Sequence, residues 1–484
     1  MADIELVRAN EVYYRVECEP SILMEMSERF TFEVPGAKFI PAVRNKVWDG
    51  KIRLLNMMTR LIYAGLGQEI CKFAESRDYT LHFIDPPRKN ELSEEQLKKF
   101  LDHVRPKHQP RDYQLAALAD GIQNERRLFL SPTASGKSLI IYLLCRWHDG
   151  KKKLIVVPTT SLVFQMASDF EEYGYREDMH RITAGVTKDT DTEITVTTWQ
   201  SIYKMPKAWF DQFDVVIGDE AHQFKAKSLT SILEKMTSCR YRYGFTGTLD
   251  GTMTNKLVLI GLFGPINQVT TTATLMEKKH VAELKIKCIV INYHEEIRKL
   301  LKKATYQEEM DYLVRSPERN KFLSQLALSL NGNTLLLFQY VEKHGKLLVE
   351  LMRSRAPERK IYFVHGAVDV NVREEIRKII ETEDNSIIIA SYGVFSTGVN
   401  IKRIHNVVFA SPTKSRIRTL QSIGRGLRNG EGKNSVVLYD VADNLSIRSH
   451  QNHTLKHFIE RVKIYDSEKF SYKILPYRIS HDGN

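Results

Sequence analysis

The chain has 484 residues and a formal net charge of +12, with 42% hydrophobic and 27% charged residues. This balance excludes a disordered chain, and the length predicts three or four compact units. The apolar runs are far shorter than the roughly 20 residues of a membrane-spanning helix, and residues 1–5 lack a signal-peptide pattern. Five scattered cysteines without a Cys-x-x-Cys pair favour a reducing, cytoplasmic location.

Residues 1–90 predict a small α+β domain. Strands are expected at 11–17, 51–55 and 79–84, with a helix at 21–30. Basic and aromatic residues interleave around Trp48, Lys51 and Arg53, and this pattern is typical of segments that bind nucleic-acid backbone. The alternative is that Trp48 anchors the core of a small domain. Residues 91–110 are proline-rich and charged, and they predict a linker that contains a helix-like piece at 93–103.

Two series of short apolar runs follow, each alternating with helical segments. Such runs are typical of strands buried on both faces, and the alternation predicts parallel sheets. We therefore expect an α/β lobe at 111–262, a second at 263–440 and a mostly helical extension at 441–484. The expected strands are 127–130, 154–157, 194–198, 215–217 and 243–246 in the first lobe, and 334–338, 361–364, 387–390, 407–410 and 436–439 in the second.

The first strand of the first lobe leads into a phosphate-binding pattern. Ser131-Pro132-Thr133-Ala134-Ser135-Gly136-Lys137-Ser138 precedes an amphipathic helix at 139–147. Backbone N–H groups of such a loop and the helix N-terminus attract phosphate, Lys137 reaches the β- and γ-phosphates, and the Ser138 hydroxyl binds Mg²⁺. The pattern therefore predicts an ATP site that uses Thr133, Ala134, Ser135, Gly136, Lys137 and Ser138.

Acidic residues follow a later strand of the same lobe. Asp219-Glu220-Ala221-His222 comes directly after the apolar run that ends at Gly218. A carboxylate at the carboxyl end of a buried parallel strand points toward the ligand-binding edge of the sheet. We expect Asp219 to hold Mg²⁺ and Glu220 to orient the attacking water. The alternative for an isolated tetrapeptide is a helix start with exposed acids.

A basic helix is expected near the end of the second lobe. Arg425 and Arg428 are three residues apart and share a helix face, and Gln421 lies four residues before Arg425. Guanidinium groups in this position stabilise charge on a γ-phosphoryl group. Taken alone, the pattern is more typical of a solvated basic helix.

The order and spacing of these three patterns resemble the superfamily 2 helicase and translocase core, which has two RecA-like lobes. The resemblance implies that Gln114, with Arg111, reads adenine and that Gly398 contacts the nucleotide. It also implies a motif at 246–248 that couples hydrolysis to movement, and contacts to one nucleic-acid strand. The implied strand-contacting residues are Thr159, Thr160, Thr198, Gln200, Gly366, Ser391 and Thr397.

The segments at 48–55, 305–309 and 390–398 extend the resemblance to the UvsW-like recombination helicases of T-even phages. That resemblance implies an ATP- and Mg²⁺-dependent enzyme, monomeric in isolation, acting on Holliday junctions, forks and RNA–DNA hybrids. It implies branch migration, fork regression and R-loop removal, with an N-terminal domain that helps to bind DNA. Protein partners, such as recombination or single-strand-binding proteins, are not specified by the sequence.

Three other functions remain open at this point. An RNA helicase uses the same core, and so does a double-strand DNA translocase subunit of a restriction system. A non-catalytic nucleic-acid-binding protein with a decayed motor is disfavoured by the intact Lys137 and Asp219-Glu220. The segment 390–484 has 15 Lys and Arg against 7 Asp and Glu, which indicates either a polyanion partner or a solvated basic surface. Its tail cations, including Arg461, either line a nucleic-acid path or belong to a helical brace.

Overall fold

The computed structural model describes residues 2–34, 36–225, 227–249, 252–397, 401, 403–413, 415, 419, 422–424, 427 and 435–479. The chain forms two compact units, one of residues 1–131 and 136–269 and the other of residues 132–135 and 270–484. No helix in these ranges is both long and apolar enough to cross a membrane.

The N-terminal domain is α+β, as predicted. Its five-stranded mixed sheet has the order β5-β6-β2-β1-β7, and β3 and β4 form a separate hairpin. Its elements are β1 (Ile4–Arg8), β2 (Tyr13–Cys18), α1 (Pro20–Arg29), β3 (Thr31–Glu33), η1 (Ala37–Phe39), α2 (Pro41–Arg44), β4 (Lys51–Arg53), β5 (Leu55–Asn56), β6 (Leu61–Tyr63), η2 (Ala64–Leu66), α3 (Gly67–Glu75) and β7 (Leu81–Phe83). Strand β1 was not predicted.

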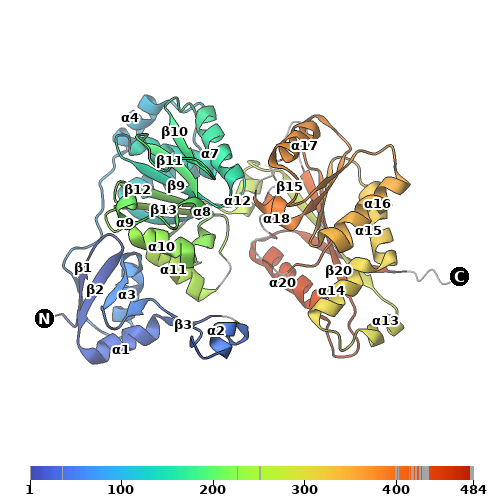
Figure 1. Ribbon diagram of the computed structural model, residues 1–484, viewed down its shortest axis with the longest axis horizontal. Coiled ribbons are helices and arrows are strands. Elements are labelled where there is room, and N and C mark those ends of the chain that lie inside the picture. Colours follow the sequence, from blue (N-terminus) through green and yellow to red (C-terminus); the bar gives the residue numbers. More distant parts are fainter. Residues whose placement is uncertain are drawn as a thin grey trace. The chain divides into compact units, whose positions relative to one another are not determined.

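The first lobe is a parallel sheet of order β10-β11-β9-β12-β13-β8-β14, with helices on its faces (Figure 1). Its elements are α4 (Glu94–Val104), α5 (Asp112–Gln123), β8 (Arg126–Leu130), α6 (Lys137–Trp147), β9 (Lys153–Val157), α7 (Thr160–Tyr173), β10 (Met179–Ile182), β11 (Ile194–Thr198), α8 (Trp199–Ile202), α9 (Lys207–Phe210), β12 (Val215–Asp219), η3 (Ala221–Lys225), α10 (Lys227–Lys235), β13 (Tyr241–Thr246), α11 (Met253–Phe263) and β14 (Ile266–Gln268).

The second lobe is also a parallel sheet, of order β17-β18-β16-β19-β20-β15-β21. Its elements are α12 (Thr272–Glu277), β15 (Glu283–Asn292), α13 (Glu295–Leu300), α14 (Tyr306–Arg315), α15 (Pro317–Ser329), β16 (Thr334–Phe338), η4 (Val341–Gly345), α16 (Lys346–Arg355), β17 (Ile361–Val364), α17 (Val370–Thr382), β18 (Ile387–Ser391), α18 (Tyr392–Thr397), β19 (Asn406–Phe409), β20 (Ser435–Asn444), α20 (His453–Ser467) and β21 (Tyr472–Arg478). The predicted fold class, two parallel-sheet lobes behind a small α+β domain, is confirmed.

Two strands lie outside the predicted boundaries of their lobes. Strand β14 pairs with β8, so the first sheet continues past the expected end at residue 262. Strand β21 pairs with β15, so the tail beyond 441 completes the second sheet and is not only helical. Both strands lie at sheet edges and carry polar residues, so neither has the apolar run of a buried strand.

The expected linker is in fact packed structure. Helix α4 begins with a capping box at Ser93 and Gln96, and its apolar face lies against the first lobe. The Phe100 and Trp147 rings meet edge to face, with centroids 5.1 Å apart. Residues 94–104 therefore form a helix of the first lobe, because their apolar face is buried there.

The N-terminal domain and the first lobe share one hydrophobic core. Buried residues of the small domain, such as Leu66 and Phe73, belong to the same cluster as Val258 and Phe263 of the first lobe. Helix α11 runs beside the small domain (Figure 1). The two parts therefore behave as one packed body.

Candidate active site

The loop predicted to bind phosphate, residues 131–138, runs from the end of β8 into the start of α6. The Ser131 N–H donates to the Thr246 carbonyl at 2.9 Å, and the Ser135 hydroxyl donates to the Pro132 carbonyl at 2.6 Å. Ala134 and Gly136 have φ values of 69° and 78°, in the left-handed region. This backbone turns the chain sharply into α6, and a tight loop that leads into the N-terminus of a helix is the arrangement that binds phosphate.

Gln114 is held against this loop from helix α5. Its amide Nε2 donates to the Gly136 carbonyl at 3.3 Å, and its Oε1 accepts from the Arg111 N–H at 2.8 Å. A Cβ atom at position 136 would overlap the Gln114 amide, so glycine is required there for space as well as for φ. The structure thus brings the two expected adenine-reading residues, Arg111 and Gln114, to the phosphate loop.

Lys137 lies between the two acidic residues at the end of β12. Its Nζ is 3.2 Å from Glu220 Oε1 and 3.7 Å from Asp219 Oδ1. Burial opposes ionisation of Glu220, but the charges of Lys137 and His222 outweigh it and hold the Glu220 pKa below its usual range. Burial raises the pKa of Asp219, against the opposing effect of Lys137. Lys137 therefore compensates the charge of the two carboxylates, and a phosphate group can take the place of those carboxylates as its partner.

Glu220 has an uncommon backbone conformation, with φ at 50°. Its N–H donates to Asp219 Oδ1 at 2.9 Å, and its Oε2 lies 3.3 Å from His222 Nδ1. A non-glycine residue in the left-handed region is strained, and such strain is typical of functional sites. The strain turns the two consecutive carboxylates toward the same lysine.

His222 connects the acidic residues to the next strand. Its Nδ1 is 2.9 Å from the Thr246 hydroxyl, which in turn donates to the Thr248 carbonyl at 3.0 Å. Thr246 ends β13, and Thr248 belongs to the segment expected to couple hydrolysis to movement. The chain Glu220–His222–Thr246 gives that segment a direct contact with the acidic residues, which the sequence order alone does not reveal.

The residues present fit a magnesium nucleotide. Asp219 is a buried carboxylate at the edge of the sheet, and a divalent cation would favour its ionised form. The Ser138 hydroxyl lies 2.8 Å from the Tyr173 hydroxyl, and its oxygen keeps a lone pair that a cation can bind. No group of three metal-binding His, Cys, Asp or Glu side chains is found in the described ranges.

The expected strand-contacting residues of the first lobe lie along one edge of its sheet. Strands β9 and β11 are parallel neighbours, with Val157 opposite Thr198. Thr159 caps helix α7, its Oγ1 accepting from the Leu162 N–H at 3.4 Å, and the Thr198 hydroxyl bonds that of Ser201. Thr160 and Gln200 are exposed beside them.

The second lobe presents a matching edge. Ser391 lies opposite Phe338 at the ends of β18 and β16, and Gly366 is exposed just after β17. Thr397 ends helix α18, and its side chain lies outside the described residues. Gln421, Arg425, Arg428 and Gly398 also lie outside the described residues.

Sequence reasoning did not assign a role to a buried polar cluster beneath this second edge. The Ser411 hydroxyl accepts from the Gln339 N–H at 3.2 Å and bonds His344 Nδ1 at 3.0 Å. Tyr392 donates to the Ser411 carbonyl at 3.0 Å. His344 and Ser411 are 67 positions apart, so no local pattern joins them. The cluster ties the ends of β16 and β18 to the loop after β19.

The basic residues of the N-terminal domain and of the tail differ in whether they are exposed or buried. Lys51 and Arg53 are exposed on β4, whereas Trp48 is half-buried and its indole N–H donates to the Lys51 carbonyl at 3.0 Å. In the tail, Arg461 is buried and forms an ion pair with Asp440 at 2.7 Å, and Tyr465 donates to the same carboxylate. Arg461 and Tyr465 therefore brace the second lobe and are not available to nucleic acid.

Comparisons with known proteins cover most of the chain. Residues 3–85 match the N-terminal domain of the DNA helicase UvsW, residues 107–251 the res subunit of type III restriction enzymes, and residues 318–430 the conserved C-terminal helicase domain. The ATP-dependent DNA helicase uvsW of Enterobacteria phage T4 is 37% identical over 95% of this chain and 96% of its own length. The chain belongs to the UvsW family of ATP-dependent DNA helicases.

Solved structures agree with this assignment. The crystal structure of T4 UvsW matches this UvsW-family helicase with a TM-score of 0.52 and 34% identity, covering 99% of this chain and 100% of that one. Yeast Dbp5 bound to RNA matches at a TM-score of 0.54 over 80% of this chain and 94% of its own, but with 13% identity. The second likeness concerns the fold alone.

Proposed function

We propose that this helicase remodels branched DNA, by migrating Holliday junctions and regressing forks, and that it unwinds RNA–DNA hybrids such as R-loops. The observation that carries the proposal is the small N-terminal domain, which is packed rigidly on the first lobe and presents an exposed basic surface. A motor that pulls one strand needs only its two lobes. A fixed second surface suits a substrate in which a further duplex arm lies beside the translocating strand.

For ATP hydrolysis, Lys137 leaves Glu220 to bind the terminal phosphates, while Gln114 and Arg111 hold adenine. Glu220, kept ionised by its surroundings, orients the attacking water. Mg²⁺, held by Ser138 and Asp219, would neutralise charge on the phosphates. By their sequence positions, Arg425 and Arg428 supply positive charge from the second lobe, with Gln421 and Gly398 beside the nucleotide.

The nucleic-acid strand is expected to run along the two sheet edges. Thr159, Thr160, Thr198 and Gln200 of the first lobe, and Gly366, Ser391 and Thr397 of the second, offer hydroxyl and N–H groups that bind phosphates without reading bases. Lys51 and Arg53 contact the backbone of a duplex arm. Trp48 braces the turn that carries them, because its indole N–H is already bonded within that turn.

The decisive experiment compares unwinding of a Holliday junction, an R-loop, a linear DNA duplex and an RNA duplex under the same conditions with ATP and Mg²⁺. We expect the junction and the R-loop to be processed faster than either linear duplex. A preference for the RNA duplex would contradict the proposal and favour an RNA helicase.

Lys137→Ala provides the matched control for this experiment. We expect the variant to lose nucleic-acid-stimulated ATP hydrolysis, by at least about a hundredfold as for other groups that stabilise the transition state, because nothing else in the described loop carries the charge. Salt-sensitive DNA binding, measured by fluorescence anisotropy, should persist. A normal rate of hydrolysis would show that the phosphate loop is assigned wrongly.

A further inference from the structure

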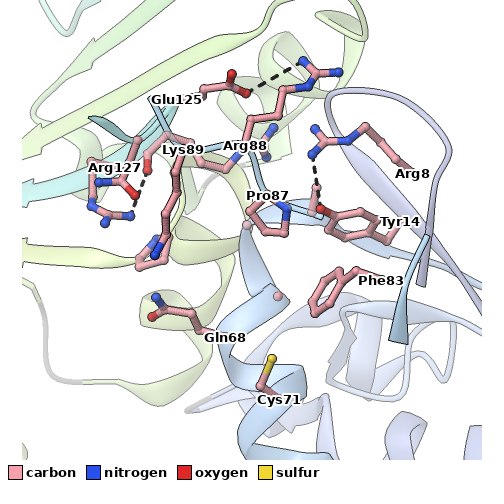
Figure 2. Close-up of a pocket in the computed structure, with 16 residues that line it drawn as sticks. Arg8, Tyr14, Gln68, Cys71, Phe83, Pro87, Arg88, Lys89, Glu125 and Arg127 are labelled. Atoms are coloured by element: carbon pink, nitrogen blue, oxygen red, sulfur yellow. Dashed lines mark hydrogen bonds and ion pairs between the residues drawn. The ribbon is translucent and has the colours of Figure 1, made fainter. Parts of the chain in front are cut away.

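A cavity of about 280 Å³ opens between the N-terminal domain and the first lobe (Figure 2). The Tyr14 and Phe83 rings, which meet edge to face with centroids 5.6 Å apart, form one side. Pro87 and Pro265 add apolar surface, and Cys71 projects toward the cavity from helix α3. None of the residues assigned to ATP or to the strand lines this space, so it is separate from the motor site.

The lining is strongly cationic. Five of its sixteen residues are basic and one, Glu125, is acidic; the basic residues are Arg8, Arg88, Lys89, Arg126 and Arg127. Four of the five basic residues already pair with carboxylates: Arg8 with Glu11 at 3.1 Å, Arg88 with Glu125 of the lining at 3.9 Å, Arg126 with Glu11 at 3.4 Å and Arg127 with Asp120 at 2.7 Å. The lining still holds more basic side chains than acidic ones.

Two of these cations can accept a further anionic or hydrogen-bonding partner. Lys89 is exposed and makes no ion pair with the residues that the structure describes. Arg126 Nη1 is fully buried and has no hydrogen-bond acceptor among them. Burial and the nearby charge of Arg242 lower the pKa of Arg126 to about 10, yet it remains charged at neutral pH. A buried charged donor without an acceptor is costly, and an arriving carboxylate would relieve that cost.

The size of the cavity limits its occupant. Pockets for whole small-molecule ligands usually measure roughly 300–1,000 Å³. The smaller space here suits one large apolar side chain, with charged neighbours resting on the rim. Protein interfaces commonly use this arrangement, in which a single anchor fills a pocket inside a polar rim.

We propose that this cavity binds an acidic peptide segment of a partner protein, which places one large apolar side chain against the side formed by the Tyr14 and Phe83 rings and directs its carboxylates toward Lys89 and Arg126. Both the small domain and the first lobe line the site, so the partner would bind across their junction. It would thereby be tethered to the helicase without blocking ATP or the translocating strand.

Fluorescence anisotropy with a synthetic peptide tests the proposal on the full-length chain. The probe is fluorescein-labelled and consists of five aspartates followed by glycine, leucine and phenylalanine. We expect saturable binding that weakens at least about tenfold when alanine replaces the phenylalanine or asparagine replaces the aspartates. The peptide should also slow alkylation of Cys71, which lies in the cavity.

Two variants and a control locate the binding. Gly67→Met fills the cavity, because a Cβ there would lie 3.6 Å from the Phe83 ring, in ordinary contact. Lys89→Glu reverses a charge on the exposed rim and should not affect folding. Both should weaken binding at least about tenfold, whereas Lys98→Glu, an equal charge change on exposed helix α4, should not. DNA-stimulated ATP hydrolysis should be unchanged in all three.

Several results would overturn the proposal. One is the absence of saturable binding to the unmodified chain. Another is equal binding by Lys89→Glu, Gly67→Met and the control. A third is slower alkylation of Cys71 in the presence of indole-3-acetate but not of the peptide, which would assign the cavity to small aromatic acids.

Discussion

Single buried charges explain why strand β20 is longer than its sequence indicates. The apolar run ends at Tyr439, but the strand continues to Asn444 through Asp440 and Asp443, which have no exposed surface. Asp440 is neutralised by Arg461, and Asp443 accepts two hydrogen bonds from Arg319 at 2.8 and 2.9 Å. Aspartates in a strand interior are unfavourable unless paired, and their partners come from distant helices.

His148 shows how burial sets a protonation state. It ends helix α6, with Nε2 3.1 Å from the Tyr243 hydroxyl, and that hydroxyl donates its own proton to the Gly121 carbonyl. Nε2 must therefore be the donor, which leaves Nδ1 as the unprotonated nitrogen of a neutral ring. Burial, helped by Lys151 and Lys153, lowers the pKa of His148 to about 3.

We predict that this histidine makes the protein less stable in mild acid. Between its ordinary pKa of about 6.5 and the folded value of about 3, the unfolded chain binds a proton that the folded chain excludes. The free energy of unfolding therefore decreases as the pH is lowered, and this group alone accounts for a decrease of about 2 kcal/mol at pH 5. His148→Gln keeps a donor and cannot titrate, so its loss of Tm between pH 7.5 and pH 5 should be smaller. Parallel Tm profiles would contradict the assignment.

Among the elements, η2 and α11 approach each other unusually closely. A Cβ on Gly65 would overlap the Ile260 carbonyl, and a Cβ on Gly261 would lie 2.8 Å from the Tyr63 side chain. Nearby, the Tyr63 hydroxyl donates to Glu234 at 2.6 Å. These glycines are needed for space, because backbone of the small domain lies directly on a helix of the first lobe.

We predict that Gly65→Ala loosens this junction. The added methyl group meets backbone, which cannot move aside as a side chain can, so we expect a loss of about 1–3 kcal/mol in the free energy of unfolding. Denaturant unfolding measures the loss, and limited proteolysis should cut the small domain faster. Gly67→Ala, two positions away with room for its methyl group, is the control. Equal stability of the two variants would show that the contact is not tight.

The tail helix α20 is fixed by a carboxylate from a distant helix. Glu309 of α14 is buried and accepts from the N–H groups of His453 and Thr454 at 2.9 and 2.7 Å. It also accepts from the Asn452 amide at 2.7 Å. The negative charge lies at the positive end of the helix, where it is most stabilising.

We predict that Glu309→Ala costs about 2–4 kcal/mol of unfolding free energy, because several buried donors lose their acceptor at once. Hydrogen exchange should increase first in residues 453–467. Glu308→Ala, which removes an exposed cap one position away, should cost about 1 kcal/mol and leave exchange in α20 unchanged. Similar losses in the two variants would contradict a special role for Glu309.

On the scale of the whole molecule, the N-terminal domain and the first lobe share a core that neither completes alone. The small domain also hydrogen-bonds the lobe through Glu11, whose carbonyl accepts from Arg126 at 2.8 Å and whose N–H donates to Thr237 at 3.0 Å. ATP-driven movement of the first lobe therefore carries the small domain and its exposed basic hairpin with it.

We predict that a chain lacking residues 1–85 aggregates. The deletion exposes Leu257, Val258 and Ile260 of α11, which are at most 6% exposed in the intact chain. An uncovered apolar patch of this kind promotes association. Light scattering and size-exclusion chromatography of the truncated and full-length chains measure the effect. A soluble, monomeric truncated chain with full ATPase activity would show that the domain is a detachable module.

The sequence by itself determined the two parallel-sheet lobes, the phosphate loop and the acidic residues after β12. These features depend on contiguous residues: an apolar run bounded by turns, and a loop whose side chains lie within eight positions. Ten buried strands were predicted from such runs, and each is present within a few residues of its expected bounds.

The tertiary structure decided the features that no run of neighbouring residues encodes. The edge strands β10, β14 and β21 are half-polar and gain their stability from one neighbouring strand. The packing of α4, the shared core at α11 and the bond from His222 to Thr246 join segments far apart in the chain. Arg461 resembled a nucleic-acid contact by composition, but a buried aspartate 21 positions away determines its role. Pairing between distant residues depends on where the fold brings them, and this information is absent from local sequence.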